Sequence, residues 1–297
     1  MKYYPEGFIR YPAKFTKESL LRAMHSGTIL ESRALSYDKD GQLHFMLGDY
    51  PAVMPHDECA DGVAEGRVRD VALMTRVGRP VCFIITSFSG GTFMLSRSLA
   101  QKMCQKNYLS TLQCGDVLRC RVTHIEPFGA FCDVGCGLSA LLPIDCLSVS
   151  RIASPSDRVK VGQDLMCVLK TRDAENRLVL SMKELLGTWA ENAAAFHPGD
   201  TVMGIVRSVE PYGVFVELTP NLAGLAETDG SYLCGQTVSV YIKSILPAKM
   251  KIKLVILHTL EEDAKTRFVS PIIAENHIER WVYSPPESSR IVETIFG

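Results

Sequence analysis

The chain has 297 residues, of which 46% are hydrophobic and 22% are charged, and its formal net charge is −1. It contains no apolar run of about 20 residues, which excludes a membrane-spanning helix, and its first residues lack the apolar stretch of a secretory signal. We therefore expect a globular, cytoplasmic protein with no membrane partner. The near-zero net charge argues mildly against tight, salt-driven nucleic-acid binding by the chain as a whole.

The ten cysteines fit a reducing compartment, because they form no Cys-x-x-Cys pair and no regular disulfide framework. Cys132 and Cys136 lie four residues apart, with Cys120 and Cys146 nearby, so a zinc site is conceivable. Their spacing differs from that of structural zinc sites. We predict small apolar core residues instead, and no metal or cofactor.

Residues 1–26 are expected to form an N-terminal extension that contains one short helix. Thr16 is a residue type that caps helix N-termini. Leu20, Leu21 and Met24 follow at helical spacing and would form an apolar face. We expect this helix to pack on the domain that follows it.

Residues 27–97 contain short alternating runs typical of β-strands, such as Leu43–Leu47. Tyr37–Gly41 has the composition of a hairpin turn. Residues 31–65 carry eight carboxylates and two cationic side chains, so this part of the chain would repel phosphate groups. We predict that residues 27–97 bind RNA poorly.

A linker helix is expected over 98–111, and after it one pattern occurs twice, over 112–184 and 197–260. The copies share a Gly-Asp turn, an alternating run, and then Glu126-Pro-Phe-Gly-Ala-Phe131 or Glu210-Pro-Tyr-Gly-Val-Phe215. Proline ends the first strand of each copy because it has no N–H for the ladder, and the glycine allows a sharp bend into the next strand. Between the copies, residues 185–196 are predicted to form a linker helix that Gly187 weakens.

The repeated pattern, followed by Gly162-Gln or Gly235-Gln and a final alternating run, resembles the S1 RNA-binding domain. That domain is a five-stranded barrel of the OB type. The resemblance implies a mostly β fold of three tandem five-stranded OB-type barrels, with short connecting helices and a C-terminal appendage. Residues 27–97 would be a degenerate copy. It is similar to the leading copies in the ribosomal protein after which the family is named, and in the family those copies serve protein contacts.

In the second barrel, the resemblance implies that Phe128 and Phe131 form a platform on which bases stack. It also implies polar contacts from Asp173 and Arg177. The histidine that the family places before the helical connection is replaced by Pro143. A basic rim could be added by Arg151, Arg158, Lys160, Lys170 and Arg172, although each of these is individually an ordinary surface charge.

In the third barrel, the resemblance places the stacking pair at Tyr212 and Phe215, and Glu227 replaces the histidine. Pro247 replaces the aspartate, and Lys251 replaces the arginine. Alternation over 249–254 predicts a strand with Lys249, Lys251 and Lys253 on one face, and such a row of like charges favours an anionic partner. The predicted RNA-binding residues are Phe128, Phe131, Arg151, Lys160, Arg172, Asp173, Arg177, Tyr212, Phe215, Lys243, Lys249, Lys251 and Lys253.

Residues 261–297 form a C-terminal tail that is too apolar to be a free extension. Trp281-Val-Tyr is expected to pack on the third barrel, or alternatively to dock on a partner. A final short helix is predicted from Ser288 to Phe296.

The chain contains no phosphate-cradling Gly-x-x-x-x-Gly-Lys loop, no Gly-x-Ser-x-Gly elbow and no His-Glu-x-x-His pair. We therefore predict a non-catalytic protein, and the resemblance implies that it binds single-stranded RNA and acts in translation. The ribosome or RNA-processing machinery would be contacted through 27–97 and the tail. The alternatives are an interaction adaptor whose barrels have lost RNA binding, and an accessory region that works with a separate ribonuclease.

Overall fold

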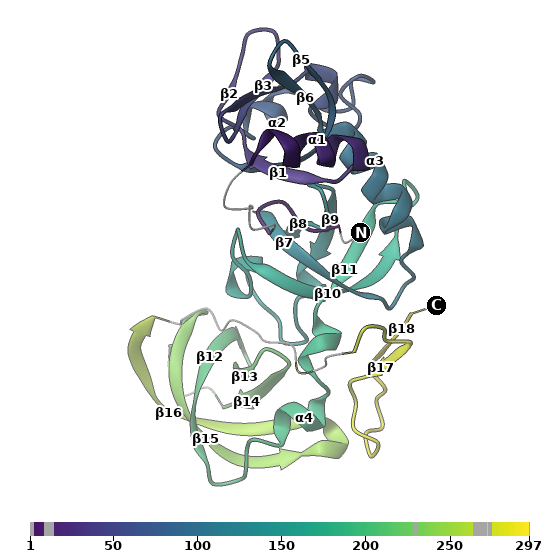
Figure 1. The fold of residues 1–297 in the computed structure, drawn as a ribbon. Helices are drawn as coiled ribbons and strands as arrows, with labels where there is room; N and C mark the ends of the chain where they lie inside the picture. Colours follow the sequence, from purple (N-terminus) through teal and green to yellow (C-terminus); the bar gives the residue numbers. More distant parts are fainter. Residues whose placement is uncertain (1–2, 9–14, 228–230, 264–271, 273–274, 297) are drawn as a thin grey trace. The chain divides into compact units, whose positions relative to one another are not determined.

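The computed structural model describes residues 3–8, 15–227, 231–263, 272 and 275–296. The chain divides into two units by its internal contacts. Unit 1 consists of Met1–Leu112, Arg119–Arg121 and Asp133–Ser139. Unit 2 consists of Gln113–Leu118, Val122–Cys132 and Ala140–Gly297. Both units are built mainly from β-strands (Figure 1).

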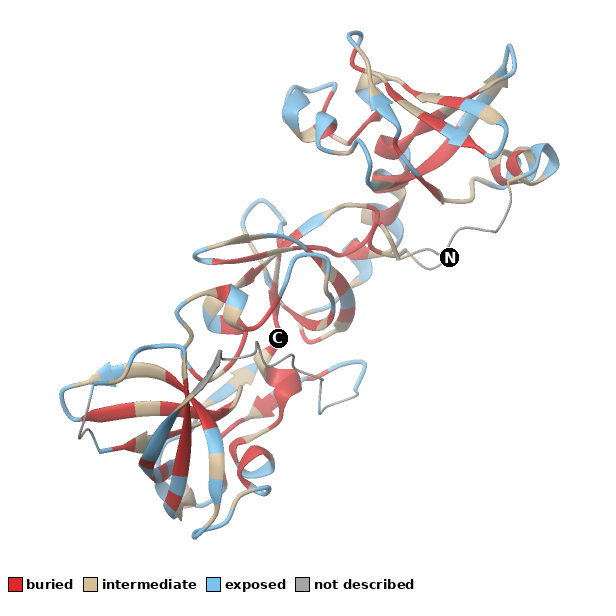
Figure 2. Cartoon of the chain, turned by 90° about the vertical axis from the view of Figure 1, so that its left-hand side faces the viewer, coloured by how far each residue is buried: buried red, intermediate tan, exposed pale blue. Residues whose placement is uncertain are grey.

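The helices are α1 (Lys17–Ser26), α2 (Asp70–Met74), α3 (Arg97–Asn107) and α4 (Trp189–Ala193). The strands are β1 (Leu30–Arg33), β2 (Ser36–Tyr37), β3 (Leu43–Leu47), β4 (Tyr50–Met54), β5 (Pro80–Ser89), β6 (Thr92–Ser96), β7 (Val117–Glu126), β8 (Gly129–Asp133), β9 (Ser139–Pro143), β10 (Asp164–Arg172), β11 (Leu178–Ser181), β12 (Thr201–Glu210), β13 (Gly213–Thr219), β14 (Leu222–Ala226), β15 (Gln236–Leu246), β16 (Lys251–Asp263), β17 (Arg280–Val282) and β18 (Glu293–Ile295). Buried and exposed residues alternate along many of these strands (Figure 2).

Unit 1 contains a six-stranded sheet in the order β1-β5-β6-β4-β3-β2. The consecutive strands β1 and β2 lie at its two ends, as if one strand had been divided in two. Helix α1 begins after the predicted cap, where the Thr16 hydroxyl accepts a hydrogen bond from the Ser19 N–H. Its residue Leu20 is fully buried in the core of the sheet. The predicted turn at Tyr37–Gly41 joins β2 to β3, and Gly41 donates its N–H to the Asp38 carbonyl.

Two closed five-stranded barrels follow, and their strands have the same order. The barrel within 112–184, which keeps the name second barrel, closes as β10-β11-β9-β8-β7. The barrel within 197–263, which keeps the name third barrel, closes as β12-β13-β14-β16-β15. In both, the third strand pairs in parallel with the fifth, at Leu141–Val179 and at Leu225–Lys253. The prediction of five-stranded barrels is confirmed for these two segments. The prediction of three five-stranded barrels is not confirmed, because the sheet of unit 1 has six strands.

Glycine is required where each barrel turns into its second strand, as the repeat predicted. A Cβ on Gly129 would lie 2.6 Å from the Leu142 carbonyl oxygen, and one on Gly213 would lie 2.5 Å from the Ala226 carbonyl oxygen. Both distances are shorter than van der Waals contact. The glycines therefore let β8 and β13 pack closely against β9 and β14.

Three predicted elements differ from the structure. The linker helix over 185–196 is interrupted at Gly187, whose φ of +79° is left-handed, so that a 3-10 turn precedes α4. The final helix from Ser288 to Phe296 was predicted wrongly, because β17 and β18 pair there as a hairpin. Lys249 lies in a 3-10 turn and not on the predicted strand, which begins at Lys251 after a left-handed Met250 (φ +48°).

Eight of the ten cysteines are buried, which agrees with their predicted place in the cores. Within the described ranges, no three His, Cys, Asp or Glu side chains are grouped so that they could hold a metal ion. None of the helices in the part of the chain that the structure describes has the length and apolar character needed to cross a bilayer.

Candidate nucleic-acid interface

A pair of aromatic rings lies on the surface of each closed barrel, at equivalent positions. The rings of Phe128 and Phe131 have centroids 6.1 Å apart and planes at 90°. Those of Tyr212 and Phe215 have centroids 6.2 Å apart and planes at 89°. Phe128 is 54% exposed and Tyr212 is 67% exposed. The four rings predicted from the sequence are therefore partly open to solvent.

Strand alternation sets the direction of the inner ring in each pair. Ala130 and Cys132 on β8 are buried, so Phe131 between them points outward and is half-buried. The outer ring is carried by the turn that begins with proline. One ring of each pair is thus fixed by a strand, and the other stands in the turn before it.

His124, which is not among the predicted RNA-binding residues, adds a third ring to the second barrel. Its imidazole stacks beside Phe131, with centroids 6.4 Å apart and planes at 21°, and its side chain is 62% exposed. It also bonds to the Glu126 carboxylate at 2.6 Å. Its nearness to the platform arises from cross-strand packing, which the order of residues in one strand does not reveal.

The predicted polar residues of the second barrel are less concentrated than its rings. Asp173 and Arg177 form an ion pair with each other across the β10–β11 turn. Partial burial raises the pKa of Asp173, but the hydrogen bond and charge of Arg177 outweigh it, and the net shift is downward. The Arg172 guanidinium reaches the Asn176 side chain at 3.4 Å. Lys160 is exposed in the loop before β10.

Arg158 does not belong to a basic rim, because its side chain is fully buried. It donates to the Glu217 carboxylate of the third barrel, which also accepts from Arg207 at 2.7 Å. Burial lowers the pKa of Arg158 and the Glu217 charge opposes that shift. Arg207 reaches Asp157 at 3.5 Å. These four residues form a buried ion cluster that joins the loop before β10 to β12 and β13.

On the third barrel, the lysines lie near the ring pair. Phe215 is opposite Leu225, and Leu225 is opposite Lys253, so these three residues form one row across β13, β14 and β16 on the outer face. Lys251 is exposed two residues before Lys253, and Lys249 is exposed in the preceding turn. Lys243 is exposed on β15, which pairs with β12 and β16.

Two hollows adjoin the Phe215 ring. One has a volume of about 330 Å³ and is lined by Tyr212, Phe215, Arg151 and Arg207, among others. The other has a volume of about 560 Å³ and is lined by Phe215, Lys249, Lys251 and Arg290, among others. The structure thus brings together five of the predicted residues, Arg151, Tyr212, Phe215, Lys249 and Lys251, along these hollows. Arg290 was not predicted, because it lies in the tail.

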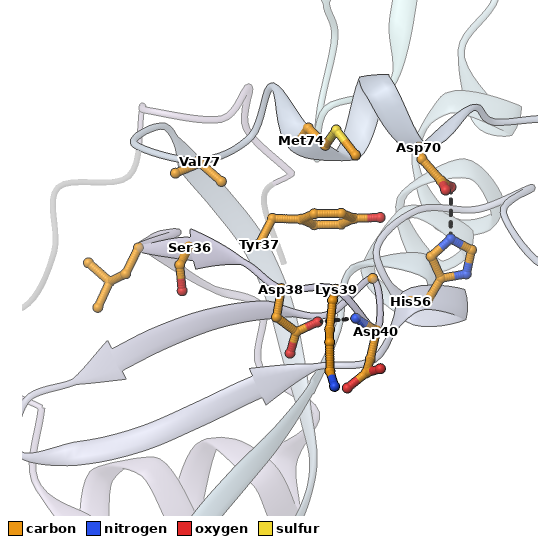
Figure 3. Close-up of a pocket in the computed structure, with 11 residues that line it drawn as sticks. Ser36, Tyr37, Asp38, Lys39, Asp40, His56, Asp70, Met74 and Val77 are labelled. Carbon is orange, nitrogen blue, oxygen red and sulfur yellow. Dashed lines mark hydrogen bonds and ion pairs between the residues drawn. The ribbon is translucent and has the colours of Figure 1, made fainter.

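A third hollow, of about 930 Å³, lies in unit 1 and has a different character (Figure 3). Three aspartates, Asp38, Asp40 and Asp70, line it together with apolar side chains that include Leu35 and Met74. Asp70 accepts from His56 at 2.9 Å. This hydrogen bond, and after it the one that Asp57 accepts from the same ring, raise the pKa of His56. Lys39 also lines this hollow, so three carboxylates stand against one ammonium group, and this surplus would repel a phosphate backbone.

Comparison with known proteins identifies the family of the second barrel. Residues 111–183 match the family model of the S1 RNA binding domain. The chain is 33% identical over 168 residues to the small ribosomal subunit protein bS1 of Staphylococcus aureus (strain N315), an alignment that covers 52% of this chain and 43% of that protein. It is 32% identical over 174 residues to the bS1 homolog of Bacillus subtilis (strain 168), covering 54% of this chain and 45% of that one. The chain thus spans less than half the length of these relatives.

Among solved structures, a multidomain protein with nucleic acid binding domains from Streptococcus pneumoniae aligns with 77% of this chain and 73% of its own, at 16% identity and a TM-score of 0.25.

The segment that matches the family model coincides with the barrel formed by β7–β11. This barrel carries the ring pair of Phe128 and Phe131. Residues 111–183 are therefore an S1-type RNA-binding domain of the OB fold.

Proposed function

We propose that the chain is a non-catalytic protein that binds single-stranded RNA through both closed barrels and acts in translation, in the cytoplasm. The observation that carries this proposal is the repetition of one perpendicular ring pair, 6.1 Å apart in the second barrel and 6.2 Å apart in the third. Core packing does not require Phe128 and Tyr212 to be more than half exposed. Two barrels that expose rings at the same place are best explained by a shared ligand.

Stacked bases and phosphates are the two parts of a single strand that such a surface can hold. A base stacked on an exposed ring contributes about 1–3 kcal/mol, largely independent of sequence, because every base has a π-face. Cationic side chains add a contribution that salt weakens. Lys251 and Lys253 supply such charge beside Phe215. Near the β10–β11 turn of the second barrel Arg172 supplies it, whereas Arg177 is paired with Asp173 and Glu175.

The relatives support a setting in translation. The aligned proteins are named as small ribosomal subunit proteins, and their similarity extends well beyond the 111–183 segment. We infer that this chain associates with RNA in that setting and with the small ribosomal subunit.

The direct test is a titration of fluorescently labelled oligo-U and oligo-A at low and moderate salt. We expect micromolar-range binding that salt weakens. The Phe128→Ala/Phe131→Ala variant should bind oligo-U roughly 5- to 150-fold more weakly for each stacked base that it loses. Absence of measurable binding to both oligonucleotides at low salt would contradict the proposal.

The acidic hollow of unit 1 favours a second candidate function, which is docking on a protein. It combines three aspartates with exposed apolar side chains, Leu35 at 54% and Met74 at 50%. A basic protein segment with apolar anchors complements such a surface, and RNA does not. If wild-type chain fails to bind RNA at low salt, the adaptor function becomes the better explanation of the fold.

A further inference from the structure

We propose that the RNA site of the third barrel is a walled groove that the barrel does not build alone. One wall is the 148–151 loop of the second barrel, with Arg151, and the other is the C-terminal hairpin, with Arg290. A single strand would lie between them, with a base on Phe215 and phosphates beside the two arginines. This inference rests on the proposed function and specifies the site and its ligand.

The two hollows beside Phe215 are continuous in their lining. They share Val149, Ser150, Phe215 and Ala223. The smaller hollow extends from this boundary to Tyr212 and Arg151, and the larger extends to Lys249, Lys251 and Arg290. A strand that crosses Phe215 therefore meets cationic side chains in both directions.

The wall formed by the 148–151 loop is fixed to the third barrel by hydrogen bonds. Val149 donates its N–H to the Asn221 side chain at 2.9 Å, and Ser150 donates its N–H to the Pro220 carbonyl at 3.1 Å. Ser148 accepts from the buried Arg158 at 3.0 Å. The buried ion cluster thus supports the loop from beneath, and Arg151 projects from a rigid base.

The hairpin wall is equally well anchored. Trp281 and Tyr283 are 4% and 6% exposed and belong to the same apolar core as the third barrel. The Tyr283 hydroxyl donates to the Asn221 carbonyl at 2.6 Å, and Thr294 donates to Glu184 at 2.9 Å. Because Trp281 and Tyr283 are buried, they are not available to dock on a partner. They hold the exposed Arg290 in place.

The charges along this groove favour a polyanion. Arg151, Lys249, Lys251 and Arg290 are exposed along it, and the lining includes one carboxylate, Glu210. Arg207 is neutralised by Glu217 and contributes little. A single strand with unpaired bases fits this arrangement, because a base must leave its stack to reach the half-buried Phe215 ring. A duplex keeps its bases paired and inaccessible.

The matched control is Arg280→Ala. It removes the same charge from the same hairpin, but Arg280 pairs with Glu293 and does not line either hollow. Arg151 and Arg290 are both exposed, so replacing them should leave the fold intact, and the thermal unfolding of each variant checks this.

The experiment is a titration of the full chain with labelled oligo-U over a range of salt concentrations, with an RNA duplex as competitor. Arg151→Ala/Arg290→Ala should weaken binding roughly three- to thirty-fold. It should also flatten the slope of log K against log salt by about 1.4, since each lost phosphate contact on a single strand contributes about 0.7. Arg151→Lys/Arg290→Lys should keep the salt slope, and the duplex should compete poorly.

The inference is overturned if the double alanine variant binds like wild type while Tyr212→Ala/Phe215→Ala binds weakly, a result that leaves the proposed function standing. Equal weakening by Arg280→Ala would also overturn it, because net charge would then explain the effect. If wild-type chain binds no oligo-U, both proposals fail.

Discussion

Glu217→Ala should lower the free energy of unfolding by about 3–5 kcal/mol. Its carboxylate is fully buried and is shared by Arg158 and Arg207. Removing it leaves the Arg158 guanidinium, also fully buried, without the carboxylate to which it donates. Breaking such a pair costs more than the pair contributes, because the remaining ion keeps its desolvation penalty.

Urea unfolding followed by tryptophan fluorescence measures this effect. Both tryptophans, Trp189 and Trp281, lie in the apolar core of unit 2, so their fluorescence reports on that unit. Asp157→Asn is the matched control, because it removes the charge of a partly exposed partner of Arg207, while its amide oxygen can still accept from the Ala153 and Ser154 N–H groups. We expect it to cost about 1 kcal/mol or less. Arg158→Met/Glu217→Leu should recover much of the loss. Equal destabilisation by Asp157→Asn and Glu217→Ala would contradict this account of the cluster.

Removing the rings of one barrel should weaken binding to a long oligonucleotide far more than binding to a short one. A strand long enough to reach both barrels binds the second one as an intramolecular step, which raises affinity by a factor on the order of 10² to 10⁴. Tyr212→Ala/Phe215→Ala leaves only the Phe128 and Phe131 site and abolishes this gain. A short strand occupies one site at a time and has no such gain to lose.

The measurement compares wild type and the variant with oligo-U of two lengths at one salt concentration. Phe128→Ala/Phe131→Ala is the reciprocal variant and should show the same dependence on length. If both lengths lose affinity by the same factor, the barrels do not act on one strand together.

Local patterns were sufficient to predict the strand ends and bends of the repeat, and the resemblance to the S1 domain implied the barrels and their ring pairs. The strand ends at Glu126 and Glu210 and the bends at Gly129 and Gly213 depend on proline and glycine chemistry within a few residues. Alternation within β8 determines that Phe131 points outward. These features are encoded near the residues that they affect, so one sequence reveals them.

Features that depend on distant partners were not predictable in the same way. Arg158 lies in a loop of polar composition, and its burial depends on Glu217, which is 59 residues away in sequence. Arg290 joins the groove because Trp281 and Tyr283 fix the hairpin to the third barrel. Lys249 lies outside the predicted strand because Met250 adopts a left-handed conformation. The alternation of polar and apolar residues does not predict that conformation.

Photo-cross-linking of oligo-U containing 4-thiouridine, followed by mass spectrometry of the cross-linked peptides, tests the central claim most directly. The claim is that RNA lies on the paired rings of the two closed barrels. We predict cross-links within the peptides that contain Phe128 and Phe131 and those that contain Tyr212 and Phe215. Cross-links confined to the six-stranded sheet of unit 1 would show that RNA binds elsewhere and would contradict the account.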